Sequence, residues 1–99
     1  MIIVTGTILA RDDSVDALLA LSLDHVRRSR TEPGCLSHAV HRDLENPLRL
    51  VFVEEWTDRT ALLTHFAVPA SRAFVKSART LAAEAPTIDV YDATPITVT

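Results

Sequence analysis

The sequence predicts an α+β domain with one four-stranded antiparallel sheet. Three observations predict it. The chain begins with a run of β-branched residues, and an amphipathic helix follows that ends at Pro33-Gly34. Two alternating runs then come on either side of a short polar turn, which is typical of a hairpin. Further helical residues and a last strand complete the order β-α-β-β-α-β, the split βαβ arrangement of ferredoxin-like folds, with the helices on one face of the sheet.

Length and composition restrict the class of protein. The chain has 99 residues and a net charge of −3, and we expect one domain over residues 1–99. A negative charge disfavours a nucleic-acid partner, because nucleic-acid surfaces on proteins are basic. No apolar run approaches the ~20 residues that cross a bilayer, and the N-terminus has no signal-peptide pattern. We therefore expect a cytoplasmic protein with neither a nucleic-acid nor a membrane partner.

The period of the apolar residues predicts each element in turn. Residues 2–10 are rich in Ile, Val and Thr and form the first expected strand. From Val15 the period lengthens, so that Val15, Leu18, Ser22 and Val26 share one helical face. The strand at 35–42 should place Leu36, His38 and Val40 on one face. The other expected elements are strands at 48–56 and 87–93, a short helix from Thr57 or Asp58 to about 67, and a helix from 69 to about 85.

Both faces of the expected sheet carry apolar residues. In the first strand neither alternating set is fully polar, and in the third strand Val51 and Val53 lie opposite Phe52. A face exposed to water would show polar residues at every second position. The simplest cover for the second face is another copy of the same sheet. We therefore expect a homodimer, in which two subunits form an α+β barrel.

Four motifs resemble those of the antibiotic biosynthesis monooxygenase family, within the dimeric α+β barrel superfamily. They are Ile2-Ile3-Val4, the run Ser29–Ser37 with its Glu-Pro-Gly-Cys turn, Glu54-Glu55-Trp56-Thr57-Asp58, and Ala61–Phe66. The resemblance covers nearly the whole chain. It implies oxidation of a small aromatic quinol or a polyketide-type phenol by O2, in an apolar cleft and with no metal, flavin or haem.

The resemblance also implies which residues could handle protons. The family usually has a histidine at the position of His65, on the helix after the Glu-x-Trp motif. His38 is a second candidate, because it could face the same cleft or the dimer interface. Glu54 is a third, because a carboxylate between two aromatic residues must be paired if it is buried. For each residue a purely structural hydrogen bond is the alternative.

Aromatic side chains are the expected walls of the cleft. Phe52, Phe66 and Phe74 would line it, and Trp56 would fill the core or the cleft wall. Two further binding candidates are Arg72, which could reach an anionic substrate edge, and Gly6, which leaves room for a ligand or marks a bulge.

The remaining histidines and the departures from the family lead to further expectations. We expect His25 and His41 at the surface or an interface, and the histidine spacing matches no metal motif, so no metal and no cofactor are expected. Haem-degrading relatives on this fold use a histidine on the later helix and an asparagine in the first strand. The helix after Pro69 and the first strand of this chain have neither, so the resemblance disfavours haem degradation. The alternative to a monooxygenase is a non-catalytic dimeric protein, stress-related or binding a small ligand.

Overall fold

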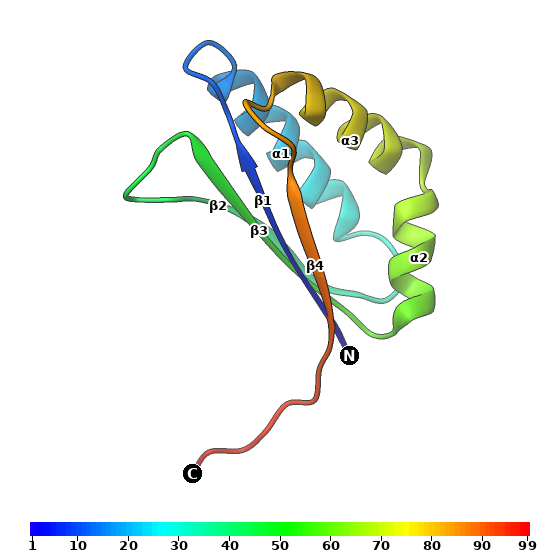
Figure 1. Ribbon diagram of the computed structural model, residues 1–99. Coiled ribbons are helices and arrows are strands. Elements are labelled where there is room, and N and C mark those ends of the chain that lie inside the picture. Colours follow the sequence, from blue (N-terminus) through cyan, green and yellow to red (C-terminus); the bar gives the residue numbers. More distant parts are fainter.

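The protein, described over residues 1–99 by a computed structural model, has the predicted α+β architecture (Figure 1). Four strands form one antiparallel sheet in the order β2-β3-β1-β4, and all three helices lie on one face of it. This confirms the ferredoxin-like class. The elements are β1 (Ile2–Leu9), α1 (Val15–Ser29), β2 (Cys35–Arg42), β3 (Arg49–Trp56), α2 (Arg59–Ala67), α3 (Pro69–Leu81) and β4 (Thr87–Asp92).

The turn between α1 and β2 lies directly against α2. Gly34 has φ +83°, a conformation that favours glycine, and a Cβ there would lie 2.5 Å from the Cβ of Ala61. The Gly34 carbonyl also accepts a hydrogen bond from the backbone N–H of Thr57 at 2.9 Å. Position 34 therefore has to be glycine for the turn to approach α2 this closely, and the approach brings Glu32, two residues earlier, to His65 on that helix.

A bulge near the start of β2 changes the predicted alternation. Cys35 is paired with Trp56 and Ser37 with Glu55, so Leu36 is an extra residue on β2. Leu36 is consequently 56% exposed, whereas the sequence pattern places it beside His38. Of the two positions expected for His38, the cleft and the dimer interface, the structure has the cleft side, where His38 is buried.

Helix α3 ends at Leu81, earlier than the expected position near residue 85. The next residue, Ala82, is extended and forms a bridge with Ala10, and the N–H of Ala83 donates to the carbonyl of Leu9 at 2.7 Å. The hydroxyl of Ser14 donates to the Leu81 carbonyl at 2.6 Å. These bonds to the end of β1 and the start of α1 replace the helical bonds and end α3.

The helices cover one face of the sheet and leave the other open within a single chain. On the covered face, the larger cluster of buried apolar residues includes Leu18, Leu50 and Phe52, and the smaller one includes Val4 and Trp56. On the open face, Val51 is half-buried and Val53 is 36% exposed. The main cavity of the protein lies on the covered face.

Candidate functional site

A cavity of about 410 Å³ lies between the helix-facing side of the sheet and the helices. Its lining is mainly apolar, with a small number of polar groups, which is typical of small-molecule sites. Eight of the nine predicted site residues line it: Gly6, His38, Phe52, Glu54, His65, Phe66, Arg72 and Phe74. The ninth, Trp56, does not line the cavity; it is fully buried beside His65, with ring centroids 4.6 Å apart.

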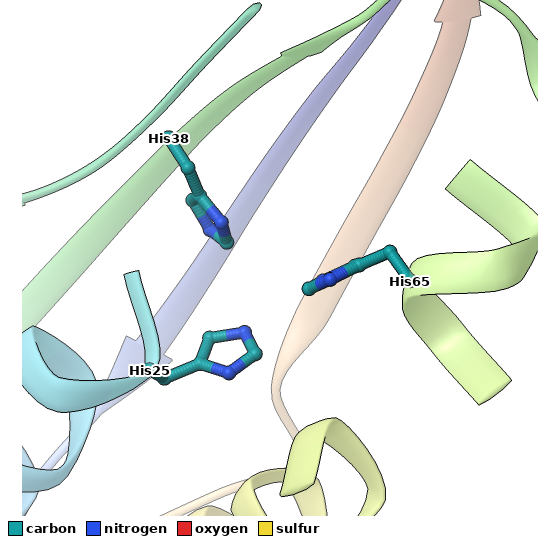
Figure 2. Close-up of side chains that lie close together, drawn as sticks. All are labelled: His25, His38 and His65. Carbon is teal, nitrogen blue, oxygen red and sulfur yellow. The ribbon is translucent and has the colours of Figure 1, made fainter. Parts of the chain in front are cut away.

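Three histidine rings converge at this cavity (Figure 2). His25 comes from α1, His38 from β2 and His65 from α2, and their ring centroids are 5.3 to 5.7 Å apart. Each of the three is at most 5% exposed. One ring nitrogen from each lies within 4.8 Å of the others. The structure thus brings together three imidazole side chains that are far apart in the sequence.

The expectation that His25 lies at the surface or an interface is wrong. His25 is three residues after the buried Ser22, on the side of α1 that faces the sheet, and its ring stacks on Phe74 with centroids 4.0 Å apart. The spacing from Leu18 and Ser22 was a signal for this burial, because positions three and seven apart share a helical face.

Glu32 orients His65 in a way that the sequence did not reveal. The Nδ1 atom of His65 lies 2.8 Å from Oε1 of Glu32. A carboxylate only accepts hydrogen bonds, so Nδ1 carries the proton that is donated to it. In a neutral ring the second nitrogen, Nε2, then has its lone pair free, and the ring points toward the other two histidines (Figure 2).

Arg28 determines the opposite tautomer at His25. A guanidinium nitrogen of Arg28 lies 3.1 Å from Nδ1 of His25. Because guanidinium nitrogens only donate, Nδ1 of His25 accepts, and a neutral ring carries its proton on Nε2. His38 differs from both, since neither of its buried ring nitrogens has a hydrogen-bond partner.

Burial keeps two of the histidines uncharged near neutral pH. It is the main reason why the pKa of His25 falls from 6.5 to about 3, with smaller contributions from His38, His65 and Arg28. Burial likewise lowers the pKa of His38 to about 3, with smaller contributions from His65 and Arg30. Both imidazoles are therefore neutral near neutral pH.

Glu54 is a buried carboxyl group without a permanently charged partner. It is 7% exposed, and Nε1 of Trp56 donates to its Oε1 at 2.9 Å. The only basic groups within 4.0 Å are Nε2 of His38 at 3.6 Å and Nε2 of His65 at 3.8 Å. Burial raises the pKa of Glu54, and the Trp56 hydrogen bond opposes this rise.

The buried histidines predict a loss of stability in mild acid. Because the folded pKa of His25 and His38 lies below the unfolded value of 6.5, the unfolded chain takes up protons first as the pH falls. The free energy of unfolding should be greatest above pH 6.5 and should fall below it, by up to about 1.4 kcal/mol per pH unit for each histidine. Protonation of folded Glu54, whose pKa is raised, offsets part of this loss.

Urea unfolding of chelator-treated protein between pH 7.5 and pH 5 measures the effect. A His25→Phe variant, which keeps a ring against Phe74, should show a shallower dependence on pH, and a variant of the exposed His41 should match the wild type. A free energy of unfolding that is constant across this pH range would contradict the prediction.

Comparison with known proteins shows the family. The antibiotic biosynthesis monooxygenase family matches residues 1–77, which is most of the chain. An uncharacterized protein from Synechocystis sp. is 34% identical over 90 residues. The match covers 91% of this chain but only 61% of that relative, so the chain spans less than two thirds of its length. The chain belongs to the antibiotic biosynthesis monooxygenase family.

Solved structures support the same assignment. A candidate antibiotic biosynthesis monooxygenase from Deinococcus radiodurans superposes with a TM-score of 0.94 at 27% identity, covering 100% of this chain and 98% of the other. A second structure described as an antibiotic biosynthesis monooxygenase has a TM-score of 0.88 at 30% identity, covering 96% and 100%. Separately, none of the helices has the length and apolar character required to span a bilayer.

Proposed function

We propose that this protein oxidises a small aromatic quinol or polyketide-type phenol with O2. The observation that carries the proposal is the pair of Glu32 and His65. Glu32 holds the ring of His65 by Nδ1 and leaves Nε2 with a free lone pair at the cavity. A base in this position can accept the hydroxyl proton of a bound phenol.

The phenolate then supplies the electrons itself. Loss of the proton makes the ring electron-rich, so that O2 can take electrons from it. In a phenol whose para carbon carries hydrogen, one oxygen atom forms a carbonyl on that carbon, the C–H hydrogen and the hydroxyl proton leave with the other oxygen atom as water, and the product is a quinone. In a quinol the oxygen atom enters at another ring C–H, and the products are a hydroxyquinone and water. The overall change consumes one O2 for each phenol and draws every electron from the substrate, so no further reductant is required.

The walls of the cavity suit such a substrate. Phe52 and Phe74 are buried and offer flat apolar surfaces, and Phe66 is 38% exposed at the edge of α2. Gly6, on β1, also lines the cavity, and a Cβ there would lie 3.1 Å from the carbonyl oxygen of Thr87. Arg72 is exposed and lines the same cavity, where it can bind an anionic substituent.

An oxygen electrode tests the proposal. Chelator-treated protein is mixed with a panel of quinols and polyketide-type phenols, and O2 uptake is expected for at least one of them, in proportion to the protein added. Binding of these compounds without O2 uptake would instead identify a non-catalytic ligand-binding protein. A Soret shift on titration with haem would favour the haem-binding alternative.

We also propose that the working form is a homodimer. The open sheet face carries Ile3, Val51 and Val53 at its centre, and burying them against a second copy would remove apolar surface from water. Light scattering at micromolar concentration should give twice the chain mass of 10.9 kDa. A mass of one chain at that concentration would refute the dimer.

A further inference from the structure

Glu54 and the histidines beside it form a cluster that the oxidation proposed above does not fully use. Only His65 is required as a base, yet His38 and Glu54 are equally buried at the same place. Both ring nitrogens of His38 are buried without a hydrogen-bond partner. A buried polar atom without a partner is unfavourable, so its presence here requires an explanation.

We propose that His38, His65 and Glu54 bind a divalent first-row transition metal ion such as Zn²⁺. Two imidazoles and one carboxylate are a frequent ligand set for such ions, and imidazole nitrogens disfavour Mg²⁺ and Ca²⁺. The three side chains come from β2, α2 and β3, so they approach one point from different directions.

The distances are compatible with a shared ion. Nε2 of His38 lies 3.6 Å from Oε2 of Glu54, and Nε2 of His65 lies 3.8 Å from Oε1 of Glu54. Ligand atoms at about 2.0–2.2 Å from one tetrahedral ion are roughly 3.3–3.6 Å apart. The two distances end on different oxygens of Glu54 and are within about 0.5 Å of this separation, so a small movement of the carboxylate would let both histidines share an ion with it. One ring nitrogen of His38 and one of His65 also lie within 4.8 Å of each other.

The charges and the surrounding hydrogen bonds point to the same ligands. Glu54 lacks any lysine or arginine within 4.0 Å, and a cation between it and the histidines would neutralise its carboxylate. Glu32 fixes the ring of His65 by Nδ1, and Trp56 holds one oxygen of Glu54. Hydrogen bonds from neighbouring groups to the ligands orient those ligands around metal ions in proteins.

His25 is not one of the proposed ligands. Because Arg28 donates to its Nδ1, its Nε2 carries a proton and is a hydrogen-bond donor rather than a ligand. That N–H can donate to a water molecule in the open position of the ion. The assignment therefore separates His25 from the ligands, although its ring is as close to them as they are to one another.

Titration of chelator-treated, full-length protein with Zn²⁺ at pH 7.5, followed by calorimetry in the absence of any phenol, tests the proposal. We expect one Zn²⁺ per chain and a rise in the thermal unfolding midpoint. His38→Gln, His65→Gln and Glu54→Gln should each weaken binding at least about 100-fold, and Glu32→Gln about 10- to 100-fold. His25→Phe should retain binding to within about tenfold.

The matched control is His41→Gln, since His41 lies on the same strand as His38 but is exposed. It should bind Zn²⁺ as the wild type does. Wild-type protein that takes up no Zn²⁺, or binding that survives loss of His38 or Glu54 in a folded variant, would overturn the proposal. So would binding that requires His25 but not Glu54. The visible absorption of Co²⁺ bound to the wild-type protein reports the ligands without any substitution, in case a variant fails to fold.

Metal binding and the proposed oxidation are separate in these tests. An ion on Nε2 of His65 would occupy the lone pair that accepts the phenol proton. Zinc should therefore slow O2 uptake by the wild-type protein, if that oxidation occurs. If no O2 uptake is found, the calorimetric result stands unchanged.

Discussion

Replacing His65 by glutamine should lower the rate of O2 uptake about 10²- to 10⁴-fold, the range expected when a general base is lost. The reason is geometric, since Nε2 of His65 is the ring nitrogen that Glu32 leaves free at the cavity. Glutamine is close in size and polar, so the cavity should keep its shape. The measurement is kcat in chelator-containing buffer, with the best compound of the quinol panel.

A Glu32→Gln variant tests whether Glu32 positions the ring of His65 for the reaction. It removes the negative charge that orients His65, so kcat should fall while KM changes little. Glu45→Gln, in the exposed turn between β2 and β3, is the matched control and should act as the wild type does. If the His65→Gln protein consumed O2 at the wild-type rate, His65 would have no part in the reaction.

Truncation of Trp56 to alanine should be the most destabilising single change, at about 3–5 kcal/mol. Trp56 is 0% exposed, packs with Ile2, Val4 and Leu62, and donates its N–H to Glu54. The loss combines a large cavity with a buried carboxyl group that has lost a donor. Since domains of this size have about 5–15 kcal/mol in total, the variant should lose a large part of its free energy of unfolding.

Urea unfolding at pH 7.5 measures this loss. Trp56→Phe should be less destabilised than Trp56→Ala, because it keeps much of the volume and loses only the N–H to Glu54. Leu44→Ala, at a fully exposed position, should change stability by no more than about 0.5 kcal/mol. If Trp56→Ala unfolded at the same urea concentration as Leu44→Ala, the packing role of Trp56 would be wrong.

Local patterns were sufficient for most of the fold. The alternation of Phe52, Glu54 and Trp56 predicted one face of β3, and these residues do face the helices. Pro33-Gly34 predicted the turn after α1. These signals are local, because burial on one face of a strand or helix repeats at a fixed spacing. The bulge at Leu36 and the early end of α3 could not be predicted, because they depend on pairing with residues far along the chain.

The candidate site could be predicted only in part. His38, Glu54 and His65 were recognised as candidates and line the cavity. Nothing close to Glu32 in the sequence marks it as the partner of a histidine 33 residues later. The burial of His25 was readable from its helical spacing, but a histidine in a polar stretch does not reveal that it stacks on Phe74.

By itself, the sequence determined the order of the elements, the antiparallel sheet with helices on one face, and the family. Each of these depends on short-range spacing and on motifs that lie within a few residues of one another. Only the tertiary structure decided which side chains meet. It brought Glu32 to His65, placed His25 among the other two histidines, and left Glu54 without a charged partner, because contacts between α1, β2, β3 and α2 exist only once the chain has folded.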